Sequence, residues 1–134
     1  MPIPPSSRTL ARVPELIARL QRLGHAARLV DHTRGRVVPE PVGAVAFEIL
    51  EGIVDVMERR ARRHQRLVVR LRIDEGMLVV STQSTAPPGS PDPILGGDPE
   101  EPRAAARAEA LGGDVTVLPT TDGGWISILR LPLG

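Results

Sequence analysis

The sequence contains no cysteine, no lysine and no tyrosine among its 134 residues, and its only aromatic side chains are Phe47 and Trp125. Without cysteine the chain has no disulfide, no thiolate ligand for zinc and no thiol nucleophile. Without lysine it has no Walker A phosphate-binding side chain and no amine for Schiff-base chemistry. The hydrophobic core must therefore be built from Leu, Val, Ile and Ala side chains.

The sequence also lacks an excess of charge of either sign. Its 17 basic and 16 acidic side chains give a formal net charge of +1, which provides no overall attraction to nucleic acid or to a membrane. No apolar run is long enough to span a bilayer, and the N-terminus has no signal-peptide pattern, so we expect a cytoplasmic protein. A chain of this length fits one domain around one core.

Hydrophobic periodicity and turn residues predict the element order. The Pro/Ser-rich residues 1–8 are expected to be a disordered tail, and residues 9–134 are expected to form the domain. The predicted elements are a helix from Val13 to Leu23 stopped by Gly24, a strand from His25 to Val30, a brief return strand from Arg36 to Val38, a long helix from Val42 to Arg62, strands from Leu67 to Ile73 and Met77 to Thr82, a helix from Arg103 to Leu111, and strands from Val115 to Leu118 and Trp125 to Leu131.

This order predicts an α/β two-layer sandwich. The hairpins favour a mixed, mostly antiparallel sheet, with the helices on one of its faces. Between the fourth strand and the last helix, residues 83–102 contain six prolines and have no periodicity, which is typical of a long loop.

The C-terminal segment RAAARAEALGGDVTVLPTTDGGWISILRLPLG, residues 103–134, combines a helix, a double glycine, a strand, a turn and a strand. This segment resembles the end of histidine-kinase-type ATPase domains, the GHKL or Bergerat fold. The resemblance extends over residues 10–134 and is closest to the ATPase domains of NarX/DesK-like sensor kinases. It implies a Bergerat ATPase-like fold in which the loop 83–102 corresponds to the ATP lid.

The long helix carries four acidic residues, Glu48, Glu51, Asp55 and Glu58, at steps of three and four. In the family, this helix holds a Glu followed four residues later by an Asn. The resemblance therefore implies that Glu51 polarises the attacking group and that Asp55, in place of Asn, ligates the Mg²⁺ of bound ATP; a carboxylate suits this hard cation. From the residues alone, the same stripe fits the solvated face of an amphipathic helix.

The other two nucleotide motifs depart from the family pattern. Thr82 or Gln83 stands where an Asp would accept the adenine amino group, and prolines follow in place of glycines. Gly96 and Gly97 are what remains of the glycine-rich phosphate loop. The neighbouring Glu100 and Glu101 would repel a triphosphate. Both changes act against nucleotide binding.

The sequence therefore favours a degenerate ATPase-like domain that regulates bacterial signal transduction by binding a protein: a sensor kinase, a response regulator, a sigma or anti-sigma factor, or a second copy of itself. No histidine has the context of a phosphoacceptor. The first alternative is a working ATP–Mg²⁺ kinase domain that resembles anti-sigma kinases and uses Glu51 and Asp55. The second is an Arg-rich nucleic-acid-associated module based on the arginines of residues 59–66. This second alternative is disfavoured because no aromatic residues are interleaved with them.

Overall fold

A computed structural model describes residues 10–60, 66–85, 101–119 and 124–134. Its elements are a 3₁₀ turn η2 (Leu10–Arg12), three helices, α1 (Val13–Arg22), α2 (Glu40–Arg60) and α3 (Glu101–Ala110), and five strands, β1 (Ala26–Asp31), β2 (Arg66–Asp74), β3 (Met77–Thr85), β4 (Asp114–Pro119) and β5 (Trp125–Pro132). The predicted N-terminal tail, residues 1–8, lies outside the described residues.

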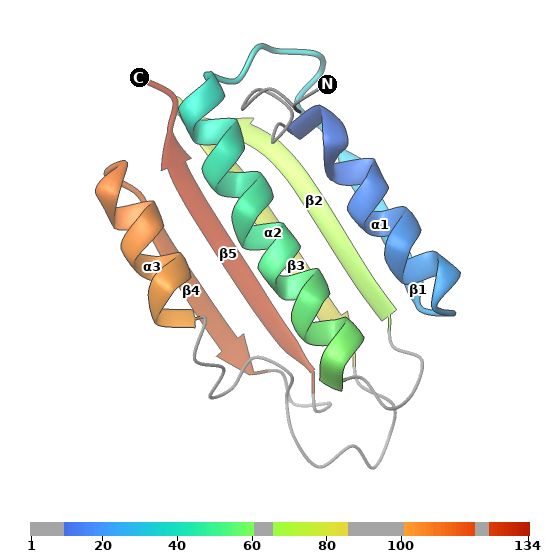
Figure 1. Ribbon diagram of the computed structural model, residues 1–134. Helices are drawn as coiled ribbons and strands as arrows, with labels where there is room; N and C mark the ends of the chain where they lie inside the picture. Colours follow the sequence, from blue (N-terminus) through green and yellow to red (C-terminus); the bar gives the residue numbers. More distant parts are fainter. Residues whose placement is uncertain (1–9, 61–65, 86–100, 120–123) are drawn as a thin grey trace, which may run out of the picture.

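The strands form one sheet in the order β1-β2-β3-β5-β4. β1 pairs with β2 in parallel, and the other three pairings are antiparallel. All three helices lie on one face of this sheet, with α2 between α1 and α3 (Figure 1). The predicted two-layer α/β sandwich with a mixed, mostly antiparallel sheet is confirmed.

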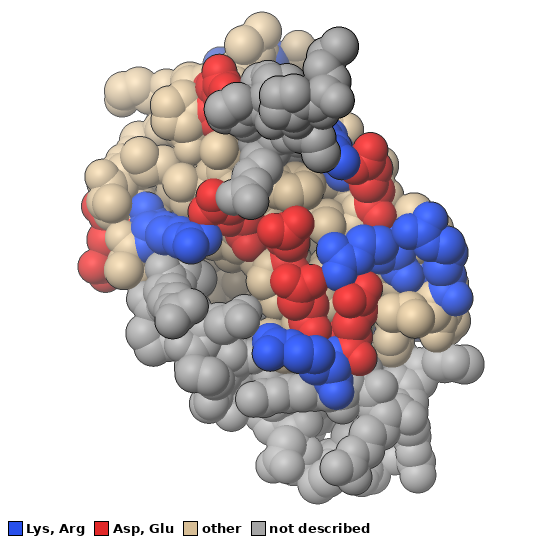
Figure 2. Space-filling view, in the orientation of Figure 1, with Lys and Arg blue, Asp and Glu red and all other residues tan. Residues whose placement is uncertain are grey.

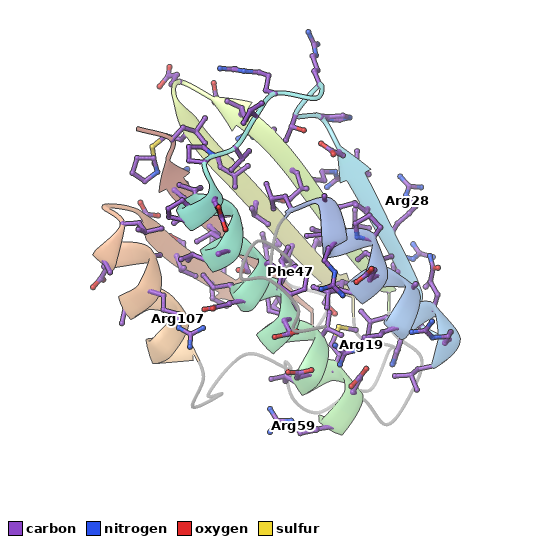
Figure 3. All side chains as sticks on the ribbon, turned by 45° about the horizontal axis from the view of Figure 1, so that its top comes forward. Arg19, Arg28, Phe47, Arg59 and Arg107 are labelled. Atoms are coloured by element: carbon purple, nitrogen blue, oxygen red, sulfur yellow. The ribbon has the colours of Figure 1, made fainter. Side chains whose placement is uncertain are left out.

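The core fills the space between the helices and one face of the sheet. Side chains of a strand alternate between its two faces, so every second residue points toward the helices. On β2 these are Leu67, Val69 and Leu71, and all three are buried. On α2 the apolar side chains cover most of the circumference, and Phe47 is buried with them (Figure 3). One solvent-exposed stripe remains on this helix.

Two helices end as their glycines predict. Gly24 follows α1 and Gly112 follows α3, and both have positive φ, which glycine adopts at little cost. After α3, the amide of Gly112 donates to the carbonyl of Glu109, and the amide of Gly113 donates to the carbonyl of Ala108. These two bonds form a Schellman motif, which satisfies the last carbonyls of the helix and turns the chain into β4.

The hairpin between β2 and β3 also follows its prediction. Glu75 and Gly76 are the two loop residues, and both have positive φ, as a type I′ turn requires. The C-terminal end of the chain is fixed to this turn, because the amide of Leu133 donates to the carbonyl of Gly76.

Three expectations about element bounds are wrong. Arg36–Val38 forms no strand; Val37 is 90% exposed, so this short connection has no neighbour to pair with. α2 begins at Glu40 rather than Val42, because Pro41 fits the first helical turn, where no amide partner is needed. β3 continues through Thr85 and α3 begins at Glu101, so the connection between them is shorter than the predicted loop 83–102.

Candidate functional site

The acidic stripe of α2 lies on the outer surface of the helix layer. Glu48, Glu51 and Asp55 are partly buried, and Glu58 is exposed. In Figure 2 the stripe runs between arginine side chains that approach it from both sides. The predicted acidic face of the long helix is therefore present, but cations from neighbouring elements surround it.

Arg19 of α1 holds two of these carboxylates at once. Its Nη2 donates to Asp55 Oδ1 at 2.8 Å and to Glu58 Oε2 at 2.8 Å, and its Nε donates to Glu58 Oε1 at 3.0 Å. The planar guanidinium can grip both oxygens of Glu58 while it still reaches Asp55, which a lysine ammonium cannot do with the same geometry. Asp55, the implied metal ligand, is therefore already paired with an internal cation.

The contact between Arg19 and Glu58 shifts the pKa of both groups. The hydrogen bonds from Arg19 lower the pKa of Glu58 below its usual value, although partial burial opposes the change. In turn, the hydrogen bonds to Glu58 and Asp55 raise the pKa of Arg19, so this guanidinium stays charged at every accessible pH. Arg19 and Glu58 therefore stabilise each other in their charged forms.

A second arginine approaches the stripe from the other side. Arg107 of α3 forms an ion pair with Glu48. Figure 3 shows Arg19 and Arg107 extending toward α2 from the two flanking helices. The stripe thus joins the three helices through charge-assisted contacts, and this use accounts for three of its four carboxylates.

Glu51, the implied catalytic residue, differs from the other three. Within the described part of the chain its carboxylate has no hydrogen bond or ion pair, and the residue is partly buried on α2. No group of three His, Cys, Asp or Glu side chains within those same residues could hold a metal ion. Among the described residues, Glu51 therefore belongs to no cluster of three such side chains.

We expect the loss of Arg19 to destabilise the fold measurably. Arg19→Gln should lower the free energy of unfolding by roughly 1 kcal/mol, because it breaks partly exposed ion pairs to two carboxylates. Arg22→Gln, an exposed change on the same helix, is the control and should have almost no effect. Thermal unfolding at low salt measures both.

The loss of folding stability caused by Arg19→Gln should also depend on pH. Glu58 has a lower pKa in the folded state than in the unfolded chain, so its contribution is present above the unfolded value of about 4.3 and is lost as pH falls through the folded value. The difference in free energy of unfolding between the wild type and Arg19→Gln should therefore become smaller below about pH 4. A difference that stays constant down to pH 2 would contradict the assigned ion pair.

The two predicted adenine contacts lie on opposite faces of β3. Thr82 is 1% exposed and faces the helices, whereas Gln83, its neighbour in sequence, faces the other side of the sheet. Only Thr82 can therefore contribute to a site between the sheet and the helices. Gly96 and Gly97, the implied phosphate-binding glycines, lie outside the described residues.

Three further side chains lie near Thr82, and the sequence did not predict them as part of the site. Ser127 is its partner in register on β5, and the next pair along the same two strands is Ser84 and Trp125. All are buried on the helix-facing side, and the Nε1 of Trp125 has no hydrogen-bond partner among the described residues. The alternation that placed Thr82 could have identified Ser84 and Ser127, but their pairing depends on the β3–β5 register, which joins strands distant in sequence.

Among the described residues, two positions implied for bound ATP–Mg²⁺ are occupied by other side-chain contacts. The implied metal ligand Asp55 is paired with Arg19. The buried indole of Trp125 lies beside Ser84 on the helix-facing side of the sheet. A cation at Asp55 would have to displace a guanidinium that is held by two carboxylates. No chemical step through this nucleotide is therefore assigned to the domain.

Comparison with solved structures identifies the fold. The blue-light-activated histidine kinase EL346 of Erythrobacter litoralis superposes with a TM-score of 0.65 at 14% identity, over 92% of this chain and 41% of that chain. A structure of the histidine kinase domain of EL346 gives a TM-score of 0.70, over 98% of this chain and 62% of that one. The nucleotide-free catalytic domain of the histidine kinase ThkA gives 0.65 at 11% identity, over 91% of this chain and 92% of that domain.

The chain therefore has the GHKL-type fold of histidine-kinase catalytic domains, and the resemblance predicted from its sequence is confirmed at the level of fold. It spans less than half of the longer EL346 chain. No protein-family model matches the sequence, and no curated protein sequence matches it. No helix among residues 10–60 and 101–110 combines the length and apolar character needed to cross a membrane.

Proposed function

We propose that this domain is a degenerate histidine-kinase-type ATPase domain, which acts in bacterial signal transduction as a regulatory module that binds another protein. The observation that carries the proposal is the contact of Arg19 with Asp55 and Glu58 at 2.8 Å. In this fold, an arginine at the carboxylate implied as a metal ligand replaces an external cation with an internal one. The domain thereby gains a stable helix layer and loses a place for Mg²⁺.

Two other features support the same proposal. Trp125 fills the helix-facing side of the sheet beside Ser84, where the family would place adenine-binding groups. In addition, His25 is buried and His32 lies in the connection after β1, so neither stands on a helix as a phosphoacceptor would. His64 lies outside the described residues. A sensor kinase, a response regulator, a sigma or anti-sigma factor, or a second copy of the chain would be the partner.

Titration with ATP and Mg²⁺ tests this proposal. We expect millimolar ATP–Mg²⁺ to leave the Tm of the domain unchanged. A ligand at about 100 times its Kd would instead raise the stability by about 2.7 kcal/mol, which is a Tm shift of several degrees. ADP and magnesium alone are the controls.

The alternative, a working ATP–Mg²⁺ kinase domain, is favoured by one observation: the carboxylate of Glu51 is partly buried and has no partner within the described ranges. Under this alternative, ATP–Mg²⁺ would raise the Tm, Asp55→Ala would abolish the shift, and Glu51→Gln would keep binding while removing turnover. Such a result would refute the degenerate-site proposal.

A further inference from the structure

The face of the sheet opposite the helices has an unusual distribution of charge. All three helices lie on the other face (Figure 1), and none of the described elements covers this one. Its side chains are those that alternate with the buried ones along each strand. Among the described residues, this surface, called the open face below, is formed by the strands alone.

Five arginines share the open face, and they lie on three strands. They are Arg28 of β1, Arg66, Arg70 and Arg72 of β2, and Arg130 of β5. All five are exposed, and none of their guanidinium groups has a hydrogen bond or ion pair within the described part of the chain. Figure 3 shows Arg28 projecting from β1 away from the body of the molecule.

The charge of these arginines is only partly compensated on the same face. Asp74 and Asp114 are its acidic side chains, and both lie at strand ends. Four of the five arginines belong to β1 and β2, so the positive charge is concentrated on that half of the sheet. The chain as a whole carries a net charge of only +1, so this concentration is local.

Apart from Arg130, Asp114 and Thr116, the other half of the open face is apolar. Ile126 and Ile128 of β5 lie there next to Leu118 of β4, which is opposite Ile126 in register and is 51% exposed. Across β3, Ser81 and Gln83 separate this apolar half from the arginines of β2. The open face is therefore basic toward β1 and apolar toward β4.

We propose that the open face docks an acidic amphipathic segment of a partner protein, with its carboxylates over Arg28, Arg70 and Arg72 and its apolar side chains over Leu118, Ile126 and Ile128. Guanidinium groups bind carboxylates in paired geometry, and the apolar half gains from leaving water. This inference rests on the proposed protein-binding role, but it does not depend on whether nucleotide binding has been lost.

Two other occupants match the open face less well. A nucleic acid would satisfy the arginines, but both aromatic side chains of the chain, Phe47 and Trp125, are buried, so no base can stack there. Nucleic-acid phosphates would also leave the apolar half uncovered. A second copy packed face to face would set the arginines either against other arginines, which is repulsive, or against the apolar half, which leaves them without carboxylates.

The probe for this proposal is a fluorescein-labelled helical peptide with Glu along one side and Leu along the other, and anisotropy measures its binding. We expect Arg70→Gln/Arg72→Gln to weaken binding by about tenfold or more. The matched control is Arg22→Gln/Arg36→Gln, which removes the same charge from exposed positions outside the open face and should change the Kd by less than about twofold. Leu118→Gln should also weaken binding, by several-fold.

Several outcomes would overturn the proposal. These are no binding by the wild type at millimolar peptide, equal weakening by the two arginine pairs, or equally tight binding of a peptide with Gln in place of Glu. Tighter binding of a random DNA duplex, lost in Arg70→Gln/Arg72→Gln, would assign the open face to nucleic acid instead. The ATP–Mg²⁺ titration is independent of all these measurements, so a failure here and a failure of the degenerate-site proposal can be distinguished.

Discussion

Gly113→Ala should destabilise the domain by about 3 kcal/mol and lower its Tm by roughly 10 °C. A Cβ on Gly113 would stand 2.0 Å from the carbonyl oxygen of Arg130 and 3.0 Å from Leu131 Cδ2. A backbone oxygen cannot move aside as a flexible side chain can. Alanine would therefore have to separate the start of β4 from β5, or distort the Schellman turn that ends α3. Thermal unfolding followed by circular dichroism measures the effect.

Gly43→Ala is the matched control, because it makes the same chemical change at a position where the added Cβ would cause no clash. Gly43 lies in α2, and its added Cβ would meet only ordinary contacts of 3.7 Å and more, to Leu10 and Val38. Alanine is the better helix former by about 1 kcal/mol, so this variant should be as stable as the wild type or more stable. If Gly113→Ala were also neutral, the close approach of residue 113 to Arg130 would be incorrect.

The elements could be predicted from the sequence because their signals are local. The alternation Leu67, Val69, Leu71 against Val68, Arg70, Arg72 is visible within seven residues, and it correctly separates the buried and solvated faces of β2. The glycines after α1 and α3 mark the helix ends in the same way. The exceptions, Arg36–Val38 and the start of α2, fall where prolines and a short connection leave the local signal ambiguous.

The contacts of the site could not be predicted in the same way, because they join segments distant in sequence. Arg19 and Asp55 are 36 positions apart, and Arg107 and Glu48 are 59 apart. Periodicity identifies the acidic stripe but not the cations that reach it. The family resemblance implied a metal at Asp55, whereas the packing of α1 beside α2 gives it a guanidinium.

Because the chain has no lysine, arginine makes all of these contacts. Every cation of this chain is a guanidinium, which is planar, permanently charged and able to bind two oxygens together. On the helix side, Arg19 and Arg107 form ion pairs with carboxylates of α2 and so join this helix to its neighbours. On the open face, Arg28, Arg70 and Arg72 have the same properties but no partner among the described residues. The two layers of the fold therefore use one chemistry for cohesion and, as proposed, for recognition.

Trp125→Ala should be the other strongly destabilising change, by about 3–5 kcal/mol. Trp125 is the largest side chain that is fully buried, and it lies where β5 begins beside Ser84 and Pro119. Truncation would leave a cavity in the core between this end of the sheet and the helices. Urea unfolding must be followed by far-UV circular dichroism, because the variant retains neither Trp nor Tyr.

Trp125→Phe separates the packing of the indole from its N–H group. Phenylalanine leaves a smaller void, and it removes the buried Nε1–H donor, for which the described residues offer no hydrogen-bond partner. Since an unpaired buried donor costs about 1–3 kcal/mol, its removal should offset most of the lost contact, for a net loss below about 1.5 kcal/mol. If Trp125→Phe cost as much as Trp125→Ala, the Nε1–H must donate to a partner in solution. In that case the indole would hold this end of the sheet by a hydrogen bond as well as by packing.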